Sequence, residues 1–189
     1  MFRSIRYNLA RLTDFSGRES RALYWPYAAT VFVLAMVIGL LLMVAPMMDM
    51  MWRMADYVQA HPEGLPTAAP GQPPALPPEL MPDFGSVMVP MAIVNLVSLL
   101  LYAAATVRRL HDRDWSGWWA ALPLPFQLAG ILVGREAMAA MLHPGAAPSP
   151  LVMLSSLNSL GYWCAFIFLV VILVGEPSRG PNRFGDPVV

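Results

Sequence analysis

Residues 24–45 read YWPYAATVFVLAMVIGLLLMVA, a run of 22 residues without a charge. A bilayer core of about 30 Å requires about 20 mainly apolar residues in a helix. Three further uncharged runs follow at residues 86–107, 117–133 and 155–174, of which the 17-residue run 117–133 is marginal in length. These runs predict helices, because lipid offers no water to satisfy exposed backbone groups. We therefore expect an all-α fold, a polytopic membrane protein with four transmembrane helices.

The composition of the 189-residue chain agrees with a location in the lipid bilayer. Hydrophobic residues make up 57% and charged residues 13%, and the mean hydropathy is +0.54, whereas soluble domains have roughly 45–50% apolar and about 25% charged residues. These values exclude a disordered chain and disfavour a soluble enzyme. The net charge of zero argues against a generally basic nucleic-acid binder, and the single Cys excludes an intramolecular disulfide and a Cys-based zinc site. We expect no cofactor, no metal and no nucleic-acid partner.

The basic residues are sorted by position along the chain. All 12 are Arg: five lie in residues 1–23, three in 108–116 and two in 175–189, against one in each of the two remaining connections. With four spans, these three Arg-rich segments share one side of the membrane, and the positive-inside rule places that side in the cytoplasm. We therefore expect one membrane domain, residues 1–189, with an uncleaved N-terminus and both termini in the cytoplasm.

The segment before the first span has two informative patterns. Residues 1–12 place apolar side chains at spacings of three and four, with Arg residues off that stripe. The stripe consists of Phe2, Ile5, Leu9 and Leu12. It indicates a short helix in the membrane interface with Arg near anionic headgroups, and a frayed tail is the alternative. Ser16 and Glu19 have the spacing of a capping box, which would start the first membrane helix.

Two unusual stretches follow the first span. Residues 47–54, MMDMMWRM, hold five thioethers, which are soft ligands suited to Cu(I). Because no His or Cys is interleaved, we favour an extension of the helix with an adaptable apolar face. Residues 61–82 hold eight of the 19 prolines, which predicts a polyproline-like or disordered extracytoplasmic loop. We favour an inert linker over a partner-binding segment there.

The four runs contain no Asp, Glu, Arg or His. Proton relays and most ion-coupled sites need such groups at depth, so a coupled transporter is disfavoured, whereas a passive pore lined by neutral groups stays open. Pro123 and Pro125 predict a kink or break in the third run, whose helix would continue weakly toward His143. Amide side chains such as Asn158 are expected to form hydrogen bonds between helices. We interpret Cys164 as a small buried hydrophobe.

Three charged segments on the predicted cytoplasmic side carry the most specific patterns: residues 15–25 (FSGRESRALYW), 108–119 (RRLHDRDWSGWW) and 175–187 (GEPSRGPNRFGDP). In this order they resemble the bacterial inner-membrane family catalogued as domain of unknown function 805, with its motifs G-R-x-x-R-x-x-Y-W, R-R-L-H-D followed by S-G-W-W, and G-x-x-G-P-N-x-[YF]-G. The resemblance covers the chain end to end, and the departures are the long Pro-rich loop and the Ser178-Arg179 pair. It implies a four-helix protein of the bacterial inner membrane, and it implies neither a reaction nor catalytic residues.

The same segments supply a candidate site for a lipid or protein partner. Its members are Arg18, Arg21, Arg108, Arg109, His111, Asp112, Trp118, Asn182 and Arg183. One interpretation is structural: Arg anchors helix ends, Trp lies at headgroup level, Asp pairs with Arg to tie the tail to the middle loop, and Gly117, Gly180 and Gly185 allow turns. A second is a site for an anionic headgroup or phosphate, because Arg offers planar bidentate donors.

A third interpretation uses His111 and Asp112 as acid and base. Adjacent residues on a helix point about 100° apart, so the two would not readily pair, and their spacing matches no standard catalytic or metal motif. We therefore expect a non-enzymatic structural or accessory protein that engages another membrane protein or anionic lipid through its Arg/Trp/Asp-rich face. The alternative is a transporter of a neutral solute or a lipid, acting alone or as an oligomer.

The orientation predicts which side of the membrane exposes each connection. In a Cys164→Ala background, a single cysteine at residue 70 should react with a membrane-impermeant thiol reagent added from outside. Cysteines at residues 113 and 180 should react only when the reagent is given access to the inner side, because the Arg-rich segments are retained there. Labelling with the two sides reversed would refute this topology.

Overall fold

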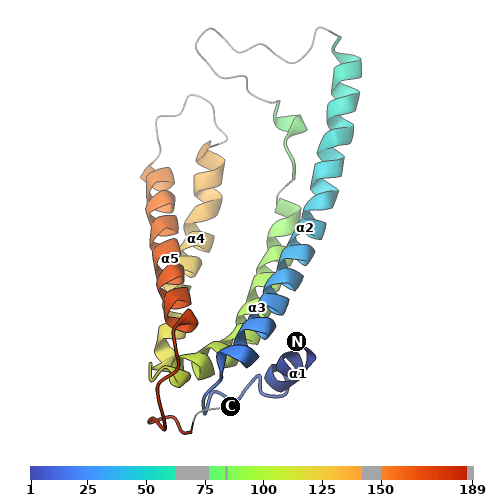
Figure 1. Ribbon diagram of the computed structural model, residues 1–189. Helices are drawn as coiled ribbons and strands as arrows, with labels where there is room; N and C mark the ends of the chain where they lie inside the picture. The colour runs from blue at the N-terminus through green and yellow to red at the C-terminus, as the bar shows by residue number, and fades with distance from the viewer. Residues whose placement is uncertain (63–76, 84, 142–149, 187–189) are drawn as a thin grey trace. The chain divides into compact units, whose positions relative to one another are not determined.

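The computed structural model describes residues 1–62, 77–83, 85–141 and 150–186, and this part of the chain is helical without a strand. Five α-helices and two 3-10 helices follow one another along the chain (Figure 1). They are α1 (Phe2–Leu9), α2 (Arg21–Ala60), η1 (Pro78–Leu80), α3 (Gly85–Asp112), η2 (Gly117–Ala121), α4 (Leu124–Met141) and α5 (Pro150–Val174). The all-α class predicted from the uncharged runs is confirmed for these residues.

Three of the predicted spans correspond to helices that are long and apolar enough to cross a membrane: α2, α3 and α5. Most of their large apolar side chains are exposed, as expected where lipid is the solvent and unusual for a soluble protein. The fourth predicted span corresponds to a shorter apolar stretch, Gly117–Val133. It combines η2 with the start of α4, and Pro123 lies between the two. The predicted break is therefore confirmed, because proline lacks the N–H that a helix interior needs and is favoured just ahead of a helix or in its first turn.

Helix α2 is longer than the span predicted at residues 24–45. Its 40 residues correspond to about 60 Å at 1.5 Å per residue, twice the thickness of a bilayer core. The Met-rich residues 47–54 are helical, which confirms the predicted extension, and Arg53 and Asp49 form an ion pair one turn apart there. The disfavoured alternative of copper binding is not tested by this helix. Of the Pro-rich loop, residues 63–76 lie outside the described residues, and its later part contains the single turn η1.

The predicted capping box at the start of α2 is wrong. The helix begins at Arg21, and the carbonyl of Ser20 accepts the amide N–H groups of Leu23 and Tyr24. The amide and hydroxyl of Ser16 donate to Asp14 instead. Glu19 turns away from the backbone into a buried ion pair with Arg108, and this stronger, charge-assisted interaction replaces the cap.

By its internal contacts the chain divides into two compact units, Met1–Phe32 with Ser98–Val189, and Val33–Val97. The first unit contains the main cluster of buried apolar side chains. The cluster comprises Tyr24, Tyr27, Ala28, Val31, Ala105, Leu110, Leu169, Ile172 and Leu173. Two tyrosines join α2 to α3 reciprocally: the hydroxyl of Tyr27 donates to the carbonyl of Leu101, and that of Tyr102 to the carbonyl of Ala28, both at 2.9 Å. In the second unit, Leu80 of η1 is buried.

Helices α4 and α5 lie side by side in the first unit (Figure 1). The side-chain amide of Asn158 donates to the carbonyl of Phe126 at 2.9 Å, which confirms the predicted interhelical hydrogen bond. The ring of Phe126 packs against Gly161, where a Cβ atom would lie 2.5 Å from it. Cys164 is exposed on α5, so the prediction that it is buried is wrong.

Candidate functional site

The three motif segments meet at one end of the first unit. Residues 15–20 precede α2, residues 108–119 include the end of α3 and η2, and residues 175–186 follow α5. Helix α1 packs beside them. We call the set formed by residues 1–23, 108–119 and 175–186 the Arg-rich end. The buried polar side chains of this end cannot form hydrogen bonds with water, so they need hydrogen-bond partners within the protein.

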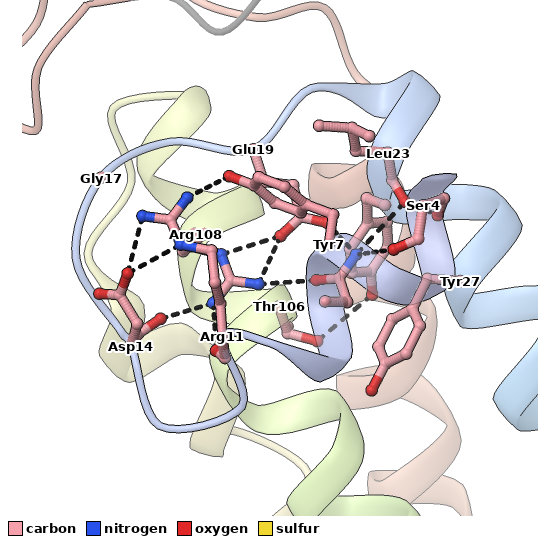
Figure 2. Close-up of polar contacts among 12 residues, drawn as sticks. Ser4, Tyr7, Arg11, Asp14, Gly17, Glu19, Leu23, Tyr27, Thr106 and Arg108 are labelled. Carbon is pink, nitrogen blue, oxygen red and sulfur yellow. Dashed lines mark hydrogen bonds and ion pairs between the residues drawn. The ribbon is translucent and has the colours of Figure 1, made fainter. Parts of the chain in front are cut away.

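Arg108 lies at the centre of one network, with its side chain fully buried (Figure 2). Its Nε and Nη2 groups approach Oε2 of Glu19 at 3.0 and 2.9 Å. Nη2 also donates to Oδ1 of Asn8 at 2.6 Å. Nη1 donates to the backbone carbonyls of Arg11, at 2.9 Å, and of Asp14. A guanidinium has five N–H donors. Arg108 forms four hydrogen bonds within the chain, and its Nη2 group also belongs to the ion pair with Glu19.

Helix α1 supplies the other polar partners of this network. The amide of Asn8 donates to Oε1 of Glu19 at 2.7 Å, and the hydroxyl of Ser4 donates to the carbonyl of Leu23. Burial raises the pKa of Glu19, and its hydrogen bond with Asn8 and the charge of Arg108 oppose that shift. The sequence analysis missed Ser4 and Asn8. Their spacing of four on the side of the helix away from the apolar stripe was the signal that identifies a polar face.

Arg18 forms the second network and binds the tail. Its Nε donates to Oδ1 of Asp112 at 3.0 Å. Nη1 donates to the carbonyls of Gly180 and Gly185 at 2.7 and 3.3 Å. Nη2 donates to the carbonyls of Asp112 and Ser178 at 3.3 and 3.0 Å. All five donors are satisfied by protein atoms, and three of the acceptors belong to the tail.

Arg109 connects the end of α5 to the same carboxylate. Its Nε and Nη2 donate to the carbonyls of Leu173 and Gly175 at 2.9 and 2.7 Å. Its Nη1 pairs with Oδ2 of Asp112, so that the two oxygens of Asp112 hold two arginines. The backbone carbonyl of Asp112 also accepts the amide of Ser178 at 2.9 Å. The predicted Arg–Asp tie between tail and middle loop is present as a different pair, Arg183 with Asp114, because both arginines on Asp112 lie outside the tail.

His111 has partners other than the neighbouring Asp112. Its ring stacks on Phe184, with centroids 3.8 Å apart, and its Nδ1 lies 3.2 Å from the carbonyl of Gly17. Asn182 donates its side-chain amide to the carbonyl of His111 at 2.9 Å. These contacts place His111 and Asn182 in the attachment of the tail. As expected from the 100° between adjacent helical residues, the imidazole and the carboxylate of Asp112 serve different partners.

The glycines of the motifs act in two ways. Gly180 and Gly185 have φ angles of +73° and +116°, a region that side chains disfavour, and their carbonyls bind Arg18. The prediction that they permit turns is confirmed. Gly117 has a different role, because a Cβ there would lie 2.7 Å from Cγ1 of Val107 and 3.3 Å from Nε2 of His111. It allows η2 to approach α3 closely.

Three candidate residues remain on the surface. Trp118 in η2 is 86% exposed and Arg21 lies exposed in the first turn of α2. Arg183 is exposed and pairs with Asp114 at 3.0 Å. Trp118 borders an apolar groove of about 620 Å³. The groove is lined by Phe15, Leu99, Leu100, Ala103, Val107, His111, Ser116, Gly117, Trp118, Ala120, Ala121 and Leu124.

The candidate residues therefore fall into two groups. Arg18, Arg108, Arg109 and Asp112 are buried and bound to other parts of the chain, so the structural interpretation accounts for their contacts. Binding of a lipid or partner by these residues stays a prediction. Across residues 1–62, 77–83, 85–141 and 150–186, no three His, Cys, Asp or Glu side chains gather in a way that could hold a metal ion.

The family described as Protein of unknown function (DUF805) matches residues 12–186, which include the first two motif segments, all but the last residue of the third and most of the Arg-rich end. No curated protein and no solved structure matches the chain.

The Arg18 network predicts that the tail detaches when this guanidinium is lost. In Arg18→Ala, and also in Arg18→Lys, the backbone amides of residues 178–185 should exchange with deuterium much faster than in the unchanged protein. Lysine keeps the charge but presents three donors from one atom, so it cannot serve acceptors arranged around a planar fork. Exchange measured by mass spectrometry in detergent micelles reports this directly.

The matched control is Arg21→Ala, which removes an exposed Arg three residues away that has no ion pair among the described residues. It should leave exchange of the tail unchanged. Equal protection of the tail in Arg18→Ala and Arg21→Ala would show that Arg18 does not hold the tail.

Proposed function

The chain belongs to the family described as Protein of unknown function (DUF805), and from that premise we propose that it is a non-enzymatic accessory protein of the bacterial inner membrane. In this proposal it crosses the membrane four times, with both termini in the cytoplasm. The Arg-rich end then forms a rigid cytoplasmic surface that engages another membrane protein or anionic lipid. Its apolar helices and its 10 Arg on one predicted side, against two on the other, support this orientation.

One observation carries the proposal: acceptors within the chain occupy both guanidinium groups, that of Arg18 through five hydrogen bonds and that of Arg108 through four hydrogen bonds and its ion pair with Glu19. A guanidinium that binds substrate or stabilises a reacting anion must keep donors directed at that ligand. These two instead join α1, α3 and the tail. The conspicuous charges of the motifs therefore support an architectural role, and the surface that they rigidify is the candidate for contact with a partner.

The exposed residues on that surface have the chemistry of an interface. Trp and Arg are enriched among the few residues that dominate binding energy between proteins. Trp118 presents most of its indole to the outside, and Arg21 lies at the start of α2. In the proposed topology Arg21 is at the level of the headgroups, where it can also meet anionic lipid.

The apolar groove beside Trp118 favours a second candidate function, the transport or handling of a lipid or neutral solute. Its volume of about 620 Å³ lies in the range of small-molecule sites, which are mainly apolar with a few polar groups. His111 and Ser116 are the polar side chains of its lining. The predicted spans contain no Asp, Glu, Arg or His, which is compatible with an uncharged cargo.

We predict that Trp118→Ala weakens retention of the partner. Native mass spectrometry of the protein, extracted mildly from its own membranes, should show a stoichiometric protein or lipid adduct. Loss of a central interface Trp typically costs 2 kcal/mol or more, so the adduct fraction should fall by a factor of about 10 or more. Trp52→Ala is the matched control. Trp52, like Trp118, has an exposed indole, but it lies on α2 in the other compact unit.

Equal loss in Trp118→Ala and Trp52→Ala would contradict a specific surface at η2. If the unchanged protein carries no adduct, the accessory role is wrong. Flux of a neutral solute or a fluorescent lipid through purified protein in liposomes, reduced by Trp118→Ala, would then favour the transport function.

A further inference from the structure

Helix α1 binds the rest of the protein through its polar side. The side chains of Ser4 and Asn8 are buried, at 3% and 1% relative exposure, whereas Phe2 is 88% and Leu9 49% exposed. An amphipathic helix on a protein surface normally buries its apolar side. Here hydrogen bonds and the Glu19–Arg108 pair hold the polar side inside. The apolar side is consequently presented outward.

The sectors of α1 follow from 3.6 residues per turn. At about 100° per residue, Phe2 and Leu9 lie within roughly 20° of each other, and about 130° from the midpoint of Ser4 and Asn8. Arg3 and Arg6 occupy the other flank of the apolar sector. Around the helix, the Ser4/Asn8 flank that contacts the protein is therefore followed by the apolar sector of Phe2 and Leu9. The cationic flank of Arg3 and Arg6 lies on the far side of that sector.

The depth of α1 is set by its attachment to α2. Ser4 donates to the carbonyl of Leu23, and the amide of Asn8 lies 3.5 Å from the same oxygen. Leu23 directly precedes the uncharged run that begins at Tyr24. Helix α1 is thereby held where α2 enters the membrane, so its exposed apolar sector is within reach of the lipid surface.

The charge around this sector is of one sign. Arg3, Arg6 and Arg21 are exposed, and no ion pair between described residues involves any of them. Residues 1–13 contain no Asp or Glu. An anionic surface complements this arrangement, because the cytoplasmic leaflet carries negative headgroups that attract basic segments near a membrane helix.

We propose that α1 docks on the surface of an anionic phospholipid bilayer. Phe2 and Leu9 insert at the boundary between headgroups and acyl chains, and Arg3 and Arg6 extend to the phosphates. This rests on the proposed cytoplasmic side for the Arg-rich end, but it involves no residue of the η2 surface. A second copy of the chain fits less well, because a symmetric contact would bring Arg flanks of like charge together.

Spin labels on the full-length protein test the proposal in nanodiscs without any partner protein. In a Cys164→Ala background, labels are attached in Phe2→Cys and in Leu9→Cys, and in Thr13→Cys as the exposed reference. Accessibility to oxygen, which concentrates in lipid, is compared with accessibility to a water-soluble paramagnetic reagent. In phosphatidylglycerol-containing discs, positions 2 and 9 should favour oxygen and position 13 the water-soluble reagent.

The contribution of charge is tested with Arg3→Gln/Arg6→Gln in the Leu9→Cys protein. Each basic residue near an anionic surface strengthens binding roughly fivefold, so the double substitution should reduce the docking equilibrium constant roughly 30-fold in phosphatidylglycerol discs. In phosphatidylcholine discs it should have little effect. The control is Arg179→Gln, which removes an exposed Arg of the tail and should leave the immersion of position 9 unchanged.

Three results would overturn the proposal. Water accessibility at positions 2 and 9 equal to that at position 13 would mean that the apolar sector does not enter lipid. Shielding of both positions from both reagents would indicate coverage by a second copy. If positions 2 and 9 were equally immersed in discs with and without phosphatidylglycerol, docking would not require anionic lipid. Because no partner protein is present, none of these results depends on whether the protein has an accessory function.

Discussion

A buried guanidinium must find an acceptor for each of its donors, and this requirement shapes the whole Arg-rich end. Carbonyls inside a helix are already bonded, so free acceptors come from helix ends and from non-helical chain. Arg108 takes the carbonyls at residues 11 and 14, just after α1, and Arg18 takes those at residues 178, 180 and 185 in the tail. These hydrogen bonds thus fix the backbone conformation of segments that have no regular secondary structure. Removing Arg108 would leave the buried carboxylate of Glu19 without its cation. Removing Arg18 would leave one oxygen of Asp112 and the tail carbonyls without this donor, although Asp112 would keep its pair with Arg109.

This constraint also separates the motif residues by role. The charges that look most like a binding site in the sequence are directed inward, whereas the residues offered to the surroundings are Trp118, Arg21 and the outer side of α1. An enzyme or ion-coupled transporter would need free polar groups at a site of reaction or passage. An architectural end that presents aromatic, apolar and cationic side chains suits a protein that meets lipid and other membrane proteins.

The helical class and the three long apolar helices followed from the uncharged runs, because the bilayer imposes a minimum length on a helix that local composition reveals. Pro123 predicted the break before α4 for an equally local reason. The extension of α2 to Ala60 was suggested only by the apolar Met side chains. Its charges did not end the helix, because Asp49 and Arg53 satisfy each other one turn apart.

The partners within the Arg-rich end were not predictable to the same degree. Glu19 appeared to be a cap, because a capping box is recognised from four neighbouring residues. Its actual partner, Arg108, lies 89 positions away. The sequence predicted that Asp112 would pair with an arginine. Most acceptors of Arg18 are backbone carbonyls, and because every residue has a carbonyl, the sequence does not indicate which ones Arg18 binds. Asn8 shows that a short polar face is as informative as the apolar stripe beside it.

The most direct measurement is a double-mutant cycle on Glu19 and Arg108 in nanodiscs, with unfolding followed by tryptophan fluorescence. Arg108→Ala alone should lower the free energy of unfolding by about 3–5 kcal/mol, because it strands a buried carboxylate. The double variant Glu19→Ala/Arg108→Ala should lose clearly less than the sum of the two single variants, with a coupling of about 1–3 kcal/mol. Additive losses, or a harmless Arg108→Ala, would contradict the view that this buried pair holds the Arg-rich end together.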